Sequence, residues 1–354
     1  MRVLIRTDAS IAIGSGHVAR CLTLAHALRK RGAQVHFACR RLPGHAIERL
    51  SDAGFLTYAL PAHYRHEHSD AGIEAALPWQ EDIYALGEQL ADEPAFDWLI
   101  VDHYGLDARW ETAARQLAHR LMAIDDLANR PHAVDILLDQ NYAAQALANP
   151  YVGLVPATCQ TFLGPHFALL REEFQCAAIP IKPRVERVLV NFGGFDAARQ
   201  VHATLSALSD CRTLELDVVA GLHNPDWDAL QALCSTRPNW RLQALADDFF
   251  GLMREADLFI GAGGGTTWER AAVGLPTLCI SVAHNQELNA RLLAQAGVHR
   301  YLGPHDHLSP AHLKAAIHAL IDDPKQRQAM AERSRMLVDG QGADRLADAL
   351  TPLQ

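Results

Sequence analysis

Short apolar runs separated by longer mixed segments make up the first half of the chain. The runs lie at Arg2–Arg6, Gln34–Cys39, Trp98–Asp102, Leu121–Asp125 and Asp135–Gln140. Such runs, bounded by polar residues, are typical of strands that are buried on both faces of a sheet. The spacing predicts helices between most of them, including one from about His17 to Lys30, which Gly32 would end.

The same alternation restarts in the second half of the chain. Strand-like runs lie at Arg187–Phe192, Thr213–Gly221, Trp240–Leu245, Asp257–Gly263 and Pro276–Ser281, and a helix-rich tail follows from about Ser309. Strands that alternate with helices indicate a parallel sheet covered by helices on both faces. The sequence therefore predicts an α/β protein of two doubly wound, Rossmann-like domains.

The boundary between the two series is marked by prolines. Pro180 and Pro183 stiffen the chain and interrupt any sheet, so we predict a linker over residues 180–184. The N-terminal domain would then span residues 1–179 and the C-terminal domain residues 185–354. Ligands of doubly wound sheets bind beyond the carboxyl ends of the strands, so we expect a site in the cleft between the domains.

Composition narrows the choice of partners. The net charge of −9 argues against a nucleic acid or an anionic membrane surface as a partner. No apolar stretch is long enough for a membrane span, so a cytoplasmic location is expected. The seven cysteines form no CxxC pair and should be reduced. We predict no cofactor and no obligatory protein partner, only a small-molecule ligand.

Histidines are frequent, and their densest cluster is the obvious candidate for a metal site. It comprises His63, His66 and His68, in a polar, loop-like stretch. A second group of ligands at the usual spacing is missing, so a solvated loop is the better interpretation and no metal is predicted.

The first motif with chemical potential is the turn from Arg6 to His17, between the first strand and the first helix. Gly14 and Gly16 allow the backbone to turn tightly and to approach a ligand. His17 lies at the helix N-terminus, where the helix dipole disfavours a second positive charge. The ring should stay neutral and able to accept a proton. The alternative is a nucleotide-binding loop with an incidental histidine.

Polar residues also follow the strand Trp98–Asp102. Tyr104 is a candidate to hold a sugar or an attacking water, and Asp102 is a candidate to orient His17. Asp102 or Asp8 could also position the water. The alternative for Asp102 is a cap in an ordinary strand-to-helix turn.

Glycine-rich turns follow two strands of the second half. The clearest motif comprises Gly263, Gly264, Gly265, Thr266 and Thr267. Adjacent backbone N–H groups at a helix start, with two hydroxyls, are suited to a diphosphate. The lysine of a P-loop is missing, which argues against ATP hydrolysis. Glu269, in the following helix, could hold a ribose diol.

Two further turns face the same predicted edge of the second sheet. Gly193 and Gly194 form another turn into a helix. Asn285 and Gln286 follow the strand Pro276–Ser281 and could contact a base or phosphate oxygens. Asn285 could equally be only the N-cap of the next helix.

These motifs together resemble one family of enzymes. The segments that carry the resemblance are RTDASIAIGSGHVARCLTLA, ACRRLPG, VDHYGLD, IDDLANRPHAVDILLDQN, GPHFALLREEF and NFGGFD. They are similar to the UDP-2,4-diacetamido-2,4,6-trideoxy-β-L-altropyranose hydrolases, which have the GT-B fold and are related to peptidoglycan N-acetylglucosaminyltransferases. The resemblance runs from Met1 to about Gly303 and is more specific in the first half. One departure is GAGGGTT, where some relatives carry serines.

The resemblance implies a metal-independent cleavage of the anomeric C1–O bond of the UDP-sugar. Water would attack with inversion, and the free sugar would serve pseudaminic acid biosynthesis and flagellin glycosylation. His17 would be the general base and Tyr104 would support it. Glu269, Asn285 and Gln286 would hold UDP. The alternatives are a GT-B glycosyltransferase with a UDP-N-acetylhexosamine donor, a nucleotide-sugar 2-epimerase and a non-catalytic nucleotide-sugar sensor.

Overall fold

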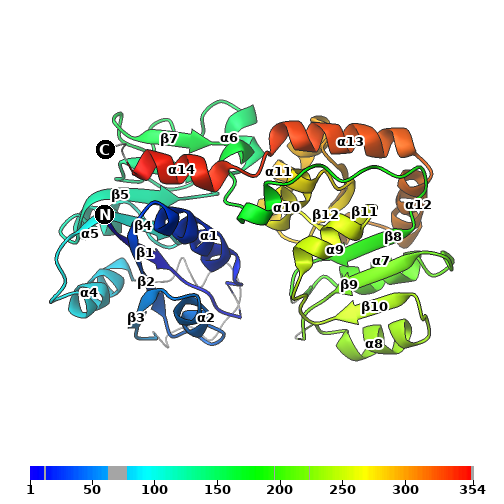
Figure 1. The fold of residues 1–354 in the computed structure, drawn as a ribbon, viewed down its shortest axis with the longest axis horizontal. Coiled ribbons are helices and arrows are strands. Elements are labelled where there is room, and N and C mark those ends of the chain that lie inside the picture. The colour runs from blue at the N-terminus through cyan, green and yellow to red at the C-terminus, as the bar shows by residue number, and fades with distance from the viewer. Residues whose placement is uncertain (12, 63–77, 195, 223, 352–354) are drawn as a thin grey trace. The chain divides into compact units, whose positions relative to one another are not determined.

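The chain folds into two compact α/β units (Figure 1). The computed structural model describes residues 1–11, 13–62, 78–194, 196–222 and 224–351. The first unit comprises Met1–Arg171 together with Gln341–Gln354, and the second comprises Glu172–Gly340. The fold class of two Rossmann-like domains is confirmed, but both boundaries differ from the predicted ones.

The first unit is built on a seven-stranded parallel sheet. Its strands are β1 (Arg2–Thr7), β2 (Gln34–Arg40), β3 (Leu56–Leu60), β4 (Phe96–Asp102), β5 (Ala118–Ile124), β6 (Ile136–Asp139) and β7 (Gln160–Leu163). They lie in the order β3-β2-β1-β4-β5-β6-β7. β1, β4 and β5 are the central strands, and their apolar side chains are buried, as expected for a sheet covered on both faces.

Helices cover the two faces of this sheet. They are α1 (Gly16–Lys30), α2 (Ile47–Asp52), α4 (Trp79–Gln89), α5 (Ala108–Ala114), α6 (Tyr142–Ala146), the 3₁₀ turn η1 (Pro165–Phe167) and α14 (Gly342–Leu350). Val18, Cys21 and Leu24 pack α1 against β1 and β2. The helix begins at Gly16, so His17 is its second residue.

The second unit repeats the design with six strands. Its strands are β8 (Arg187–Asn191), β9 (Glu215–Val219), β10 (Trp240–Gln243), β11 (Leu258–Ala262), β12 (Thr277–Ser281) and β13 (Arg300–Pro304), in the order β10-β9-β8-β11-β12-β13. The α-helices are α7 (Gln200–Ala207), α8 (Trp227–Ser235), α9 (Phe249–Glu255), α10 (Thr266–Val273), α11 (His284–Gln295), α12 (Pro310–Ile321) and α13 (Pro324–Leu337). Two 3₁₀ turns complete the unit, η2 (Glu172–Phe174) and η3 (His305–His307).

The C-terminal helix α14 returns to the first unit, where it packs beside α1 (Figure 1). Leu346 and Leu350 are completely buried in the core between α14 and the sheet. The indole of Trp98 donates a hydrogen bond to the carbonyl of Leu350 at 3.0 Å. Arg31 forms ion pairs with two aspartates of α14. The prediction assigned this helix to the second domain and is therefore wrong.

The predicted linker 180–184 lies within the second unit. The guanidinium of Arg327 donates to the carbonyls of Lys182 and Pro183 at 3.0 and 2.9 Å. The N–H of Ile179 bonds to the carbonyl of Val273 at 3.1 Å. The two prolines do exclude regular structure here, but the units divide earlier, between Arg171 and Glu172.

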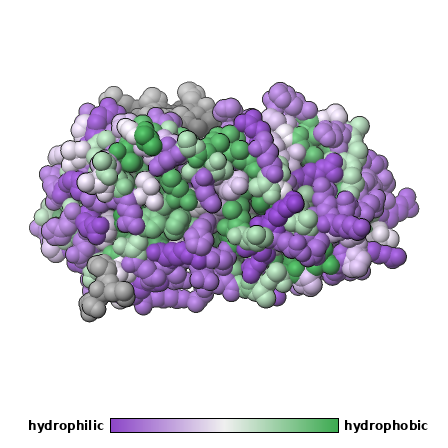
Figure 2. Space-filling model, turned by 90° about the horizontal axis from the view of Figure 1, so that it is seen from above, coloured by the Kyte–Doolittle hydropathy of each residue, from purple (hydrophilic) through white to green (hydrophobic). Residues whose placement is uncertain are grey.

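Polar residues dominate the face of the molecule in Figure 2, with hydrophobic residues in smaller groups between them. Within the described ranges, no helix is both long enough and apolar enough to cross a membrane. All seven cysteines are free thiols, as predicted.

The packing of α14 can be tested with a single truncation. Leu346→Ala removes a completely buried side chain from the first unit, so we expect the free energy of unfolding of that unit to fall by roughly 2–5 kcal/mol. Urea unfolding measures it. Met336→Ala in α13 is the control, because this side chain is 87% exposed and its truncation should cost less than about 0.5 kcal/mol. Equal effects of the two variants would contradict the placement of α14.

Candidate active site

The candidate site of the first unit lies where β1 and β4 end side by side. Thr7 at the end of β1 is paired with Asp102 at the end of β4. The sheet order reverses between these two strands, and the chain leaves them toward different helices, α1 and α5. In doubly wound sheets this is the point at which ligands bind.

His17 and Asp102 are in direct contact, as the sequence predicted. The Nδ1 atom of His17 lies 2.6 Å from Oδ1 of Asp102. The imidazole is 7% exposed and the carboxylate is completely buried. Asp102 is therefore more than a cap of the following turn, since it holds the ring.

Arg20 binds the same carboxylate through two nitrogens on one side of its guanidinium. Its Nε donates to Oδ2 of Asp102 and its Nη2 to Oδ1, each at 2.7 Å. This bidentate geometry is the strongest form of an arginine–carboxylate pair. Burial alone would raise the pKa of Asp102, but the charge of Arg20 and the hydrogen bond from His17 hold that pKa well below its usual range.

The ionised carboxylate settles the tautomer of His17. Asp102 can only accept, so the proton of the neutral ring must lie on Nδ1. Nη2 of Arg20 is 3.2 Å from the same nitrogen, but arginine has no acceptor, so this approach is not a second hydrogen bond. The basic lone pair of the neutral ring is consequently on Nε2.

Tyr104 and Asp126 complete the cluster around His17. The hydroxyl of Tyr104 donates to Oδ2 of Asp126 at 2.8 Å, and Nη1 of Arg20 donates to the same oxygen at 2.6 Å. The ring of Tyr104 meets that of His17 edge to face, with 4.6 Å between centroids. Burial and the charge of Asp126 raise the pKa of Tyr104 well above its usual range, so its hydroxyl stays protonated.

Arg20 and Asp126 were not predicted as site residues, although the sequence carries a signal for each. Arg20 is three positions after His17, which places both on one face of α1. Asp126 comes two residues after the end of β5, at the same edge of the sheet as Asp102.

Asp8 is buried beside this cluster but has partners of its own. Its carboxylate accepts from Nη2 of Arg6 at 2.8 Å and from the N–H of Arg40 at 2.7 Å, and Nε2 of His103 is 3.5 Å away. Burial would raise the pKa of Asp8, but the charge of Arg6 and the nearby ring of His103 lower it far below the usual range. These bonds tie the turn after β1 to β2, and a role for Asp8 in positioning water stays a prediction.

Gly14 shapes the turn between β1 and α1. Its φ of +79° is in the left-handed region that glycine tolerates, and its N–H donates to the carbonyl of Ser10 at 2.8 Å. Added Cβ atoms on Gly14 and Gly16 would meet no heavy atom of the described residues within 4 Å, so the backbone of the turn has space beside it.

Two aspartates share one tyrosine hydroxyl at the neighbouring ends of β5 and β6. The hydroxyl of Tyr151 lies 3.0 Å from Oδ2 of both Asp125 and Asp139. A hydroxyl has one proton to donate, so a proton on one of the two carboxyls would satisfy the second contact. Burial would raise the pKa of Asp125, but the nearby ring of His132, whose Nε2 is 3.8 Å from Oδ2, and the charge of Arg130 hold it well below its usual range. Asp139 is therefore the carboxyl whose surroundings favour the proton.

The electrostatics of Asp139 agree with this hydrogen-bond count. Burial and the nearby charge of Asp126 raise its pKa to about 8. Its Oδ1 accepts from the N–H of Asn141 at 2.8 Å, which leaves Oδ2 as the oxygen that contacts the hydroxyl of Tyr151. A neutral Asp139 spares the His17 cluster a further negative charge.

The second unit places its glycine turns at the equivalent position. β8 and β11 are neighbours, with Asn191 paired to Gly261. A Cβ on Gly261 would lie 2.0 Å from the carbonyl oxygen of Asn191, so only glycine fits there. The turns that follow these strands, at Gly193–Gly194 and Gly263–Gly265, therefore start from the same point of the sheet edge.

The turn at Gly263–Gly265 leads directly into α10, as predicted. Thr266 and Thr267 are the first two residues of this helix, and Glu269 is the fourth. Gln286 packs against the turn, since a Cβ on Gly263 would lie 3.4 Å from its Cβ. Its Oε1 accepts from the N–H of Val282 at 3.1 Å, which fixes the side-chain amide beside the glycines.

The remaining predicted residues of the second unit are more exposed. Gly193, with a φ of +93°, and Gly194 are both solvent-exposed. Asn285 is exposed and is the second residue of α11, whose N-cap is Ala283. The alternative that Asn285 caps this helix is therefore wrong.

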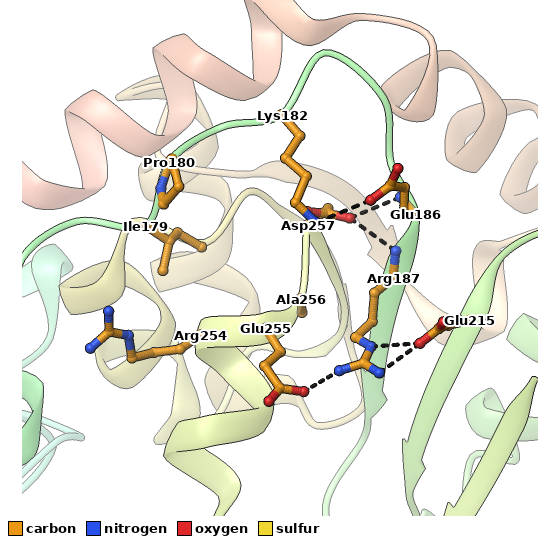
Figure 3. Close-up of a pocket in the computed structure, with 10 residues that line it drawn as sticks. All are labelled: Ile179, Pro180, Lys182, Glu186, Arg187, Glu215, Arg254, Glu255, Ala256 and Asp257. Carbon is orange, nitrogen blue, oxygen red and sulfur yellow. Dashed lines mark hydrogen bonds and ion pairs between the residues drawn. The ribbon is translucent and has the colours of Figure 1, made fainter.

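A charged pocket in the second unit lies away from these turns (Figure 3). It surrounds the start of β8, at the opposite end of the strand from Asn191. Its charges satisfy one another: Asp257 accepts from the N–H groups of Glu186 and Arg187 at 2.8 and 2.9 Å, and Arg187 pairs with Glu215. This pocket anchors the chain before β8 and contains none of the predicted site residues.

Metal ligands gather at one place among the described residues. Asp210, Cys211 and His318 lie together on the surface between α7 and α12. Asp210 is already paired with Lys314 at 2.8 Å, and the group is remote in sequence from every glycine turn. The histidines at positions 63, 66 and 68 lie outside the described residues, so that interpretation stays a prediction.

Comparison with known proteins identifies the family. The chain is 30% identical over 298 residues to the UDP-2,4-diacetamido-2,4,6-trideoxy-beta-L-altropyranose hydrolase of Campylobacter jejuni, a match that covers 84% of this chain and 97% of the relative. The chain belongs to this hydrolase family. In addition, the model of the glycosyltransferase family 28 C-terminal domain matches residues 191–349 of this family member.

Solved structures place this hydrolase family member among GT-B proteins. The spinosyn rhamnosyltransferase SpnG superposes with a TM-score of 0.70 at 18% identity, over 99% of this chain and all of that one. MurG of Acinetobacter baumannii superposes with a TM-score of 0.66 at 18% identity, over 99% of both chains. At such low identity these likenesses establish the fold alone.

The protonation of Asp139 can be tested through the pH dependence of stability in this hydrolase family member. The folded state holds the proton up to about pH 8, whereas an unfolded aspartate loses it near about pH 4. Stability conferred by the protonated group is thus complete below about pH 4 and is lost as the pH rises toward about 8. Asp139→Asn keeps the donor toward Tyr151 without this proton. We expect its melting temperature, relative to wild type, to rise steadily from about pH 5 to about pH 8.

Calorimetry at several pH values measures this difference. The control is Asp52→Asn, an exposed carboxylate at the end of α2, whose difference from wild type should hardly change with pH. A pH-independent difference for Asp139→Asn would show that Asp139 is ionised in the folded protein.

Proposed function

We propose that this protein hydrolyses UDP-2,4-diacetamido-2,4,6-trideoxy-β-L-altropyranose at the bond between the sugar and UDP. The observation that carries the proposal is the contact of 2.6 Å between His17 Nδ1 and the buried, ionised Asp102. This contact gives the ring a basic Nε2, which is what a general base requires. Membership of the hydrolase family supports the substrate, since the Campylobacter jejuni relative carries this activity in its name.

In the proposed reaction, water attacks the anomeric carbon while His17 Nε2 takes its proton. The C1–O bond breaks, and its electron pair stays on the oxygen of the departing UDP. Attack from the face opposite to UDP inverts the anomeric centre. Asp102 stabilises the imidazolium that forms, and Arg20 keeps Asp102 ionised. Tyr104, whose ring meets His17 edge to face, helps to orient the base.

The second unit would bind the nucleotide. The N–H groups at the start of α10, with the hydroxyls of Thr266 and Thr267, suit the negative charge that develops on the diphosphate. Gln286, held beside Gly263 and Gly264, would contact phosphate or base. Glu269 would accept from the ribose hydroxyls, and Gly193, Gly194 and Asn285 would line the nucleotide from the neighbouring turns.

A glycosyltransferase that uses a UDP-N-acetylhexosamine donor is the alternative. It is favoured by the match of residues 191–349 to the glycosyltransferase family 28 C-terminal domain. A transferase needs a sugar acceptor, whereas a hydrolase needs only water. Incubation with the UDP-sugar alone separates the two: stoichiometric UDP and free sugar support hydrolysis, and release of UDP only after an acceptor is added supports transfer.

The role of His17 is tested by His17→Asn. The asparagine side chain keeps an N–H group near the position of Nδ1, so the hydrogen bond to Asp102 can survive while Nε2 is removed. We expect kcat to fall by roughly 10²–10⁴-fold, with a much smaller change in KM. Product NMR measures turnover and also identifies the anomer that is released first.

His119→Asn is the matched control, because His119 is exposed on β5 and should retain wild-type turnover. If His17→Asn retains turnover within a few-fold of wild type, His17 is not the base. If the wild type binds UDP but turns over no UDP-sugar, the protein is a sensor and the proposed reaction is wrong.

A further inference from the structure

Arg270 is a buried positive charge directly behind the glycine turn of the second unit. Its side chain is 2% exposed. The guanidinium donates to the carbonyl of Ala262 at 2.8 Å and to the hydroxyls of Thr266 and Thr267 at 3.3 and 3.0 Å. No carboxylate forms an ion pair with it within the described ranges of the chain. The guanidinium also faces the ring of Phe259, 4.8 Å from its centroid, and Sγ of Cys279 at 3.9 Å. These contacts stabilise the charge only in part, since burial of a charge without a counter-ion is costly.

Other buried arginines of this protein have a carboxylate or the negative end of a helix dipole that compensates their charge. Arg6 is paired with Asp8 and Asp82, and Arg40 with Asp82. Arg327 donates only to carbonyls, but those of Leu320 and Ile321 are at the C-terminal end of α12, the negative end of a helix dipole. That dipole compensates the charge of Arg327.

The guanidinium of Arg270 lies at the opposite end of a helix dipole. Arg270 is the fifth residue of α10, and its side chain reaches back toward the first turn, as long side chains of helices do. Its charge therefore adds to the positive end of the dipole. The two together attract an anion at the turn Gly263–Gly265.

The hydrogen bonds from Arg270 also set the direction of two hydroxyl protons. Arginine only donates, so the oxygens of Thr266 and Thr267 must be the acceptors. The hydroxyl protons then point away from the guanidinium. Thr266 is half-buried and can offer its proton to a ligand, whereas Thr267 is only 2% exposed. A phosphate oxygen, which only accepts, is the complement of such donors.

We propose that Arg270 is a positioning residue for the diphosphate group, which orients the two threonine hydroxyls and supplies a buried positive charge behind the turn. The inference rests on the proposed function for the identity of the anion as UDP. The charge and the hydroxyl orientation concern any diphosphate, including inorganic pyrophosphate. Arg270 does not touch the ligand, so its effect should depend on the phosphates and leave the nucleoside alone.

The test is calorimetric titration of the full chain with UDP, uridine and inorganic pyrophosphate. Arg270→Met removes the charge and the donors, and we expect UDP and pyrophosphate to bind roughly 10–100-fold more weakly, with uridine binding unchanged. Arg270→Lys keeps the charge but not the several N–H donors of the guanidinium, so its affinities should be intermediate. Thr266→Val, which removes one hydroxyl, should weaken UDP several-fold, and Thr266→Ser should restore it.

Arg327→Met is the matched control, since it removes a buried arginine of the same unit that donates only to carbonyls. It should lower the melting temperature and leave the UDP affinity within about two-fold of wild type. If Arg270→Met does not fold, Arg270→Lys and Thr266→Val decide the question.

Three results would overturn the proposal about Arg270. One is unchanged UDP and pyrophosphate affinity in the variants of Arg270 and Thr266. The second is an equal loss of uridine and UDP binding, and the third is a wild type that binds neither UDP nor pyrophosphate. A wild type that binds UDP in the expected way but hydrolyses no UDP-sugar would contradict the proposed reaction and leave the role of Arg270 intact.

Discussion

The buried carboxylate of Asp102 is the constraint on which the candidate site depends. It is completely buried and ionised, so its neighbours must supply compensating donors. His17 and Arg20 do so from successive turns of α1, which fixes that helix against the end of β4. Arg20 extends the constraint to Asp126, and Asp126 holds Tyr104. One carboxylate thereby determines the tautomer and the setting of the imidazole.

The two units use the same sheet topology for opposite electrostatic purposes. In the first unit the strand ends carry aspartates, whose charges keep a histidine oriented and, at Asp139, retain a proton. In the second unit the corresponding edge carries glycine turns, a helix N-terminus and the buried guanidinium of Arg270. The first arrangement suits proton transfer, and the second suits a diphosphate. The proposed hydrolysis needs both.

The strands that could be predicted from the sequence are those that appear as uninterrupted runs of apolar residues. Central strands such as β1 and β4 are buried on both faces, and their runs are unmistakable. The edge strands β3 and β13 and the short strand β7 were missed, because many of their side chains are only half-buried and the pattern weakens accordingly. The assignment of α14 was also beyond the sequence, since the amphipathic pattern shows that a helix has an apolar face and not which core receives it.

Part of the candidate site could also be predicted from the sequence. His17, Asp102 and Tyr104 follow strands or precede a helix, and the rule for ligands at strand ends brought them together. Arg20 and Asp126 required the side-chain geometry, because a charged residue on a helix or after a strand is usually solvated. The proton on Asp139 depends on two carboxyls sharing one tyrosine hydroxyl, which no linear spacing reveals.

The proposed reaction depends on the tautomer of His17, and nitrogen NMR of the ring tests that tautomer most directly. In protein labelled with ¹⁵N-histidine, the His17 signals are those that vanish in a His17→Gln variant. We expect a proton on Nδ1 and an unprotonated, basic Nε2 for the neutral ring, and loss of this preference in Asp102→Asn. A proton on Nε2 in the neutral wild-type ring would contradict the account.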